Sequence, residues 1–443
     1  MKKIVYGLTI LLILGSVFLT ACGSTSGTMS NPTLTPNGSP DSPNTRSQIV
    51  VISDIHLGVS DSFAECVKNR SALVDFLNQT RNSPNIKELV IDGDFLDEWV
   101  LPMDYIMPPS ESALVDTIAA NNKTVIEAFN NIIGDGNIKV TYIHGNHDML
   151  VTAADIQRIF PGINQSRDDA QGLSTYVTGV NSEIAIEHGH RYVFSCSPDP
   201  ISNRNITQNG TSILPVGYFF TRIAASSLVE GNPATSNVLP EINANQNDPG
   251  QLGYYVYAKT LAAVLSKVPV KEAFSAKVLQ TQIDGYTENY AINDLMPYQD
   301  PSTGKLAVNL YKGIVETWEK RQELNGVPVL VPLKDAILKS TDDLFEDSQA
   351  KTQYFDRDSS KRIVVFGHTH VAKLEPCTNV EGQKTIYANT GTWIDNTQDD
   401  PAMTYIIITL PEGNSAVESV SLYQYSADKT VTQLGDTQSI TIR

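Results

Sequence analysis

The run Leu89-Val90-Ile91-Asp92-Gly93-Asp94 joins a short apolar segment directly to two acidic residues. A short apolar run bounded by turn-forming residues predicts a buried β-strand, so the acidic residues follow the carboxyl end of that strand. Two other segments repeat the pattern: residues 48–52 run into Ser53-Asp54-Ile55-His56, and residues 138–143 run into His144-Gly145-Asn146-His147-Asp148. The sequence therefore predicts several strands that each end in polar side chains.

Helix-like segments separate these strands, one extending through Leu77 and one covering residues 112–133. Strands that alternate with helices indicate an α/β fold, which forms its sites at the carboxyl ends of its strands. Residues 175–187 and 362–366 predict two further strands, which end at His188-Gly189-His190 and at Gly367-His368-Thr369-His370. A second sheet that closes the core is expected from the β-rich runs 385–388, 403–410 and 417–425.

The segment 195–360 differs in character from the sequence on either side of it. It contains helix-like stretches at 252–267 and 306–321, separated by connections rich in Asn, Pro and Gly. We therefore expect a largely helical insertion or cap at 195–360 in a main domain formed by residues 48–194 and 361–443. The aromatic runs at 217–220 and 254–257 either form the core of this insertion or stack on a bound molecule.

The amino-terminal segment is typical of an export signal. Lys2 and Lys3 precede an apolar stretch that ends at Leu19-Thr20-Ala21-Cys22. This ending resembles a bacterial lipobox, which implies removal of a signal peptide at 1–21 and acylation of Cys22 with chains such as palmitate. Residues 22–47, mostly Ser, Thr, Pro, Asn and Gly, predict a flexible tether. We expect an extracytoplasmic protein that is lipid-anchored to a bacterial cell membrane; an uncleaved transmembrane anchor is the alternative.

The charge of the chain limits its partners. The formal net charge is -17, and the segment 1–21 contributes two lysines and no acid. The mature chain would carry 30 basic against 49 acidic residues, a net charge of -19. Such a surface repels a phosphate backbone, so we expect no tracking along nucleic acids. The oligomeric state is left open.

Three cysteines remain after Cys22, at positions 66, 196 and 377. They are too scattered for a Cys-x-x-Cys metal site, and an odd number permits one disulfide at most. The sequence favours ordinary buried thiols at Cys66, Cys196 and Cys377.

All histidines of the chain fall in the polar clusters that follow predicted strands. The seven are His56, His144, His147, His188, His190, His368 and His370. Carboxylate, imidazole and amide groups without thiolate suit divalent metals such as Mn, Fe, Zn or Ni. The clusters therefore predict a metal site.

Five motifs occur in the order that is known from one family: Asp54-x-His56, Gly93-Asp94-x-x-Asp97, Gly145-Asn146-His147-Asp148, His188-Gly189-His190 and Gly367-His368-x-His370. In these motifs the chain resembles the calcineurin-like metallophosphoesterases, over about 48–194 and 361–396. The resemblance implies an α/β fold, a four-layer α/β/β/α sandwich, in which two divalent metal ions activate a bridging hydroxide.

The resemblance also implies a role for each matching residue. One metal ion would be bound by Asp54, His56, Asp94 and His370, and the second by Asp94, Asn146, His188 and His368. Asp94 would then bridge the two ions. His147 would stabilise the phosphate and help to protonate the leaving oxygen, and Asp97 would orient His147. The role of His190 stays open, because the second histidine of such a pair is metal-adjacent, substrate-facing or structural.

At several motif positions the chain differs from particular subfamilies of the metallophosphoesterases. Purple acid phosphatases carry Tyr where this chain has Asp97, and Ser/Thr protein phosphatases carry Arg-Gly where it has Glu98-Trp99. The segment 93–99 resembles that of UDP-diacylglucosamine hydrolases, but those have Arg at the position of His147. The match is therefore to the broad family and leaves the substrate undetermined.

We expect a metal-dependent hydrolase that acts on phosphate mono- or diesters outside the cytoplasm. Two alternatives stay open: a pyrophosphate hydrolase of the UDP-diacylglucosamine hydrolase type, and a non-catalytic surface lipoprotein that keeps the fold for binding. An amidohydrolase is disfavoured because the first strand of such enzymes typically leads into His-x-His, whereas this chain has Asp54-x-His56.

Overall fold

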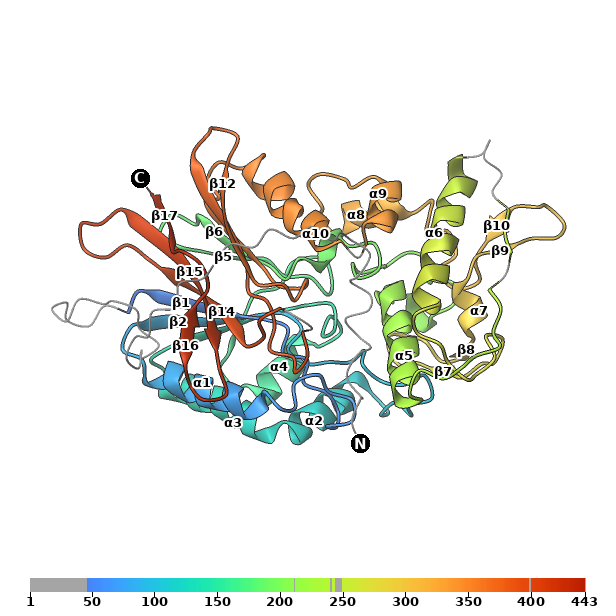
Figure 1. Ribbon diagram of the computed structural model, residues 1–443, viewed down its shortest axis with the longest axis horizontal. Coiled ribbons are helices and arrows are strands. Elements are labelled where there is room, and N and C mark those ends of the chain that lie inside the picture. Colours follow the sequence, from blue (N-terminus) through green and yellow to red (C-terminus); the bar gives the residue numbers. More distant parts are fainter. Residues whose placement is uncertain are drawn as a thin grey trace.

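The computed structural model describes residues 46–210, 212–239, 241–243, 249–340, 342–397 and 400–442. The expected signal peptide, the acylation site Cys22 and the tether up to residue 45 lie outside the described residues. In Figure 1, two sheets with flanking helices form one part of the molecule, and helices α5 to α7 lie at its other end. Among the helices that the structure describes, none combines the length and apolar character needed to span a membrane.

The first sheet has eight strands in the order β16-β15-β14-β1-β2-β3-β4, with β17 paired to β15. Its parallel half consists of β1 (Gln48–Ile52), β2 (Ile86–Asp92), β3 (Lys139–Ile143) and β4 (Asn164–Gln165). Its antiparallel half consists of β14 (Thr404–Thr409), β15 (Val417–Tyr425), β16 (Val431–Gln433) and β17 (Gln438–Thr441). The prediction of an α/β fold with a parallel-strand sheet is confirmed.

The second sheet has five strands in the order β12-β13-β11-β6-β5. The strands are β5 (Tyr176–Thr178), β6 (Ile184–Ile186), β11 (Ile363–Phe366), β12 (Lys373–Thr378) and β13 (Lys384–Asn389). Strand β11 pairs in parallel with both β6 and β13. The chain thus leaves this sheet after β6 and returns to its centre through β11, which brings the residues after both strands together.

The strands of the first sheet are apolar on both faces. Val50 and Ile52 of β1 join the apolar cluster that includes helices α1 and α3, whereas Ile49 and Val51 join a cluster shared with the second sheet. Successive side chains of a strand point to opposite faces, so β1 packs on helices on one side and on β6 and β11 on the other. This double burial explains why the strands read as continuous apolar runs.

Four helices accompany the first sheet: α1 (Arg70–Asn82), α2 (Glu111–Asn121), α3 (Lys123–Asp135) and α4 (Ala153–Ile159). The single helix expected at 112–133 is wrong, because α2 and α3 are separate helices that meet at Asn122. The buried Asn122 side chain donates hydrogen bonds to the carbonyl oxygens of Gly58 and Ile118, at 2.9 and 2.8 Å. These bonds fix a turn that the apolar periodicity does not reveal.

The strand expected at 175–187 is also two elements, β5 and β6, which pair in antiparallel fashion. A turn separates them, in which Gly179 has φ +96° and the Glu183 carboxylate accepts hydrogen bonds from the amides of Val180 and Asn181. The helix expected at 306–321 is likewise wrong at its start, since strand β10 (Leu306–Ala307) and a series of turns precede helix α8 (Trp318–Leu324).

The segment 195–360 contains most of the remaining helices. They are α5 (Val216–Val229), α6 (Pro249–Leu265), α7 (Ile292–Leu295), α8 (Trp318–Leu324), α9 (Leu333–Leu338) and α10 (Asp343–Ala350), with the π-helical turn Lys351–Phe355 after α10. Two hairpins are formed by β7 (Leu279–Gln280) with β8 (Asn289–Tyr290) and by β9 (Tyr298–Gln299) with β10 (Leu306–Ala307). Short 3₁₀ turns lie at His190–Tyr192 and Gln208–Gly210.

Helix α5 attaches this segment to the sheets. Its Arg222 is fully buried and donates to the carbonyl oxygens of Leu101 and Pro102, at 2.7 and 2.8 Å. Its aromatic residues Tyr218, Phe219 and Phe220 are buried in the same apolar cluster as α1 and α3. The aromatic run 217–220 is therefore core. Cys66, Cys196 and Cys377 are free thiols.

Candidate metal centre

The candidate ligands come from loops that directly follow five strands. Asp54 and His56 follow β1, Asp94 and Asp97 follow β2, Asn146 and His147 follow β3, His188 follows β6, and His368 and His370 follow β11. Parallel strands within each sheet end on the same side, so their loops meet at one edge. The structure brings the predicted ligands of both sheets into one cluster, which is buried except that His368 and His370 are partly exposed.

Several candidate ligands have an unusual backbone. The φ angles of Asp54, His56, Asp94, His368 and His370 lie between 49° and 69°. Positive φ is uncommon for residues other than Gly, and such conformations are concentrated at functional sites. The loops therefore turn sharply where they present these side chains.

Two glycines permit the loops to approach each other. Gly93 has φ +80°, and a Cβ atom there would lie 2.6 Å from His188 Nδ1. A Cβ atom on Gly145 would overlap the Asp94 carboxylate. Both motif glycines are required by the close contact between neighbouring loops.

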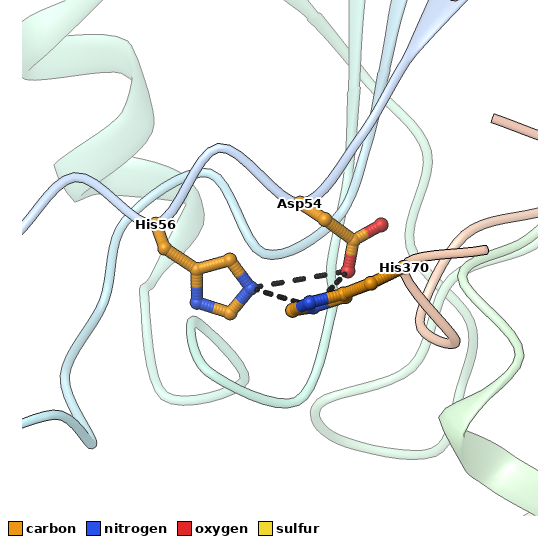
Figure 2. Close-up of side chains that lie close together, drawn as sticks. All are labelled: Asp54, His56 and His370. Carbon is orange, nitrogen blue, oxygen red and sulfur yellow. Dashed lines mark hydrogen bonds and ion pairs between the residues drawn. The ribbon is translucent and has the colours of Figure 1, made fainter. Parts of the chain in front are cut away.

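The first donor group contains Asp54, His56 and His370 (Figure 2). The Asp54 Oδ1 atom lies 3.2 Å from His370 Nε2 and 3.9 Å from His56 Nε2, and the two Nε2 atoms are 3.2 Å apart. Asp54 Oδ1 is buried and accepts no hydrogen bond from the described residues. One oxygen and two nitrogens thus point toward a common position, as the ligands of a cation do.

The second donor group contains Asp94, His188 and His368. The Nδ1 atom of His188 donates to the carbonyl oxygen of Asp92 at 2.7 Å, which leaves its Nε2 atom to face Asp94 Oδ2 at 3.1 Å. A ring nitrogen held in this way presents the other nitrogen as a metal ligand. Asn146 lines the same pocket, and its buried Oδ1 atom has no hydrogen-bond partner in the described part of the chain.

Asp94 lies between the two groups. Its Oδ2 atom is 3.6 Å from His56 Nε2 and 3.1 Å from His188 Nε2. Its Oδ1 atom accepts a hydrogen bond from the amide of His147 at 2.8 Å, which fixes the carboxylate. Asp94 is therefore placed to contact a cation in either group.

Asp97 holds two histidines at once. Its Oδ1 atom accepts from His147 Nδ1 at 2.9 Å, and its Oδ2 atom accepts from His56 Nδ1 at 2.8 Å. The His147 ring also stacks on Trp99, with ring centres 4.6 Å apart. These contacts fix the ring of His147 and direct the Nε2 atom of His56 toward Asp54 and Asp94.

Comparison with known families agrees with this geometry. Residues 47–215 match the model of the calcineurin-like phosphoesterase family. This part of the chain belongs to that family. The match ends before the segment that carries His368 and His370, and a search of curated proteins found no match to the chain. The family prediction is confirmed, and the phosphoesterase fold together with the Asp and His groups points to hydrolysis of phosphate esters.

The charges in the phosphoesterase site compensate one another. Burial alone raises the pKa of the Asp54 and Asp94 carboxyl groups, but the neighbouring histidines, His188 foremost, together outweigh burial and hold both pKa values below their usual range. Burial lowers the pKa of His188, yet Asp94 and Asp54 raise it to about 10. Burial and the charge of His188 lower the pKa of His368 to about 3. Histidines bind metals in the neutral form, so divalent ions would replace the protons that now balance the carboxylates. The donor set is compatible with divalent metal ions.

The pKa of His147 is raised. Burial lowers it, but the neighbouring carboxylates Asp97 and Asp94 outweigh that effect. A proton on this imidazole is therefore favoured next to the donor groups.

Besides His147, two of the seven histidines, His144 and His190, join neither donor group. His190 Nε2 donates to the carbonyl oxygen of Gly172 at 3.0 Å, and its ring centre lies 5.4 Å from that of His188. His144 contacts the carbonyl oxygen of Val151 at 2.9 Å and the guanidinium of Arg167 at 2.7 Å. Both histidines serve to hold the loops behind the site.

Sequence reasoning missed three side chains at the site. Glu65 lies 3.4 Å from His56 Nδ1, Trp99 supports His147, and Glu346 lies 3.9 Å from His368 Nε2. Trp99 lies two residues after the motif that ends at Asp97, so its position near the site could have been anticipated. Glu65 and Glu346 belong to no motif and carried no comparable signal.

Proposed function

We propose that the protein hydrolyses phosphate mono- or diesters by means of two divalent metal ions. The observation that carries this proposal is the position of Asp94, within 3.6 Å of His56 and 3.1 Å of His188. The proposed ligands are Asp54, His56, Asp94 and His370 for one ion and Asp94, Asn146, His188 and His368 for the other. Two such ions, when bound, provide positive charge toward phosphoryl oxygens and lower the pKa of water.

His147 is proposed to provide the proton for the leaving oxygen. Its Nδ1 atom is held by Asp97 and its ring is held by Trp99, so Nε2 is the atom left for a substrate. His147 lines the pocket together with Asp94 and His56. A fixed imidazole beside the reacting group is suited to general acid catalysis.

The insertion is proposed to select the substrate. The pocket beside the metal ligands is lined on this side by Ser195, Cys196, Gly217, Thr221, Ser340 and Glu346. None of the described residues that line the pocket is Lys or Arg. A lining of small neutral side chains and one acidic residue offers no positive charge to additional phosphates, so simple esters are favoured over pyrophosphates of the UDP-diacylglucosamine type.

Activity measurements test the proposal directly. The purified protein, stripped of metal and reloaded with Mn, Fe, Zn or Ni, is assayed on phosphomonoesters, phosphodiesters and pyrophosphates. We expect metal-dependent hydrolysis of at least one ester. Absence of hydrolysis with every metal and substrate, together with tight binding of a phosphate ester, would favour the non-catalytic alternative.

The site of action is proposed to be the outer surface of a bacterial cell membrane, with Cys22 acylated and residues 23–47 as the tether. This proposal is supported by Lys2, Lys3 and the apolar run before Leu19-Thr20-Ala21-Cys22. Cys22→Ala is expected to abolish incorporation of labelled fatty acid, whereas Cys66→Ala is expected to leave it unchanged. Normal labelling of the Cys22 variant would contradict the proposal.

A further inference from the structure

Helix α10 of the insertion places an acidic side chain against the second donor group. Glu346 lines the same pocket as Asp94, Asn146 and His368. Its Oε2 atom lies 3.9 Å from His368 Nε2. The residue is 6% exposed, and Oε2 has no hydrogen-bond partner among the described residues.

A buried carboxylate oxygen without a partner is costly in free energy. The next acidic residue on α10 shows the usual solution: Asp347 is paired with Lys373 and accepts hydrogen bonds from Tyr387 and Asn389. These contacts attach α10 to strands β12 and β13. They hold Glu346 in a position where it faces the metal ligands and finds no comparable protein partner.

The distance fits a shared cation. Imidazole nitrogen and carboxylate oxygen each bind ions such as zinc at about 2.0–2.2 Å, so two ligand atoms of one ion lie at most about 4.4 Å apart. The separation of 3.9 Å between Glu346 Oε2 and His368 Nε2 lies within that limit. Building on the two-metal function proposed above, we propose that Glu346 binds the metal ion held by Asn146, His188 and His368.

The contrast with Glu65 sharpens this assignment. Glu65 lies 3.4 Å from the Nδ1 atom of His56, a nitrogen already bonded to Asp97. Glu65 also lines the pocket and is grouped with His56 and Asp97. It faces a ring nitrogen that Asp97 already holds, whereas Glu346 Oε2 has no hydrogen-bond partner among the described residues. An added carboxylate makes the second site richer in oxygen and more negative, which favours Mn²⁺ over softer ions.

Mn²⁺ titration calorimetry on the metal-stripped full chain tests the proposal. Glu346→Gln keeps the shape of the side chain and removes its charge. We expect the parent protein to bind two ions, and the variant to bind one of them at least about 10-fold more weakly, the least effect known for partners of a metal ligand. Glu319→Gln, which changes an exposed carboxylate on α8, should match the parent.

Two further measurements separate metal binding from support of His368. In a crystal structure of the Mn²⁺-loaded parent, Glu346 Oε2 should lie about 2.0–2.2 Å from one ion; a separation beyond about 3 Å from both ions overturns the proposal. Without metal, Glu346→Gln should melt at a temperature no lower than the parent, because Gln keeps the shape of the side chain and replaces a carboxyl group whose charged form burial disfavours. This comparison also shows whether the variant folds.

The outcomes for the two proposals are distinguishable. If the parent binds two Mn²⁺ ions and Glu346→Gln binds both with parental affinity, only the role of Glu346 fails. If the parent binds no Mn²⁺, Fe²⁺, Zn²⁺ or Ni²⁺, the proposed two-metal function fails with it.

Discussion

The strand-end loops and the insertion border the same pocket but contribute different kinds of side chain to it. The loops supply Asp54, Asp94 and His188 from strands that are buried on both faces. The insertion supplies small neutral groups and Glu346, and neither α5 nor α10 was among the helix-like stretches expected from the sequence. The loops are therefore suited to determine which reaction is catalysed. The insertion is suited to determine which substrate and which metal ion are preferred.

The largest expected effect is that of Asp94→Asn. Asp94 contacts both donor groups, so its replacement should weaken both metal sites and abolish turnover. Metal analysis should show a content far below that of the parent protein. Asp104→Asn, which alters an exposed carboxylate, is the matched control. Retention of two ions by the Asp94 variant would contradict the bridging role.

His147→Ala should have a smaller effect on activity and none on metal content. His147 contributes its backbone amide, not its ring, to Asp94, so the donor groups stay in place. The rate should fall by about 10² to 10⁴, the usual contribution of a positioned acid or base. The loss should be smaller for aryl phosphates than for alkyl phosphates, because a good leaving group needs less protonation. Parental rates on an alkyl phosphate would remove His147 from the mechanism.

Asp97→Asn should affect metal binding and activity together, but moderately. Asp97 holds the rings of His56 and His147 from outside the first donor group. The affinity for one of the two ions should fall about 10- to 100-fold, as is usual for a partner that orients a metal ligand. Titration with Mn²⁺ measures this change. An unchanged affinity would mean that packing alone orients His56.

Much of the loop region could be predicted from the sequence, because buried strands produce apolar runs and their ends produce polar clusters. Strand β1 was predicted with its observed bounds, Gln48–Ile52. The break between α2 and α3 was missed because it depends on one side chain, Asn122, that bonds to Gly58, far away in the sequence. Long-range contacts of this kind leave no local pattern.

The site shows the same limit. The family resemblance named Asp54 and His370, which lie 316 residues apart in the chain, because each belongs to a motif. Glu346 could not be found in this way, since its position depends on how α10 is attached through Asp347 to Lys373. Side chains that an insertion brings to a site become visible only in three dimensions.

The smallest expected effect is that of a substitution outside the site, which tests whether a buried acidic residue always indicates a metal-binding site. Glu418 of β15 is fully buried, and burial together with the neighbouring Glu183 raises its pKa to about 9. The unfolded chain loses this proton near the ordinary value of 4.5. Between these values a rise in pH favours the unfolded state, so stability should decline with rising pH up to about 9. Glu418→Gln should reduce this decline, measured as melting temperature at several pH values, with metal content unchanged. A variant as sensitive to pH as the parent would show that Glu418 is already ionised in the folded protein.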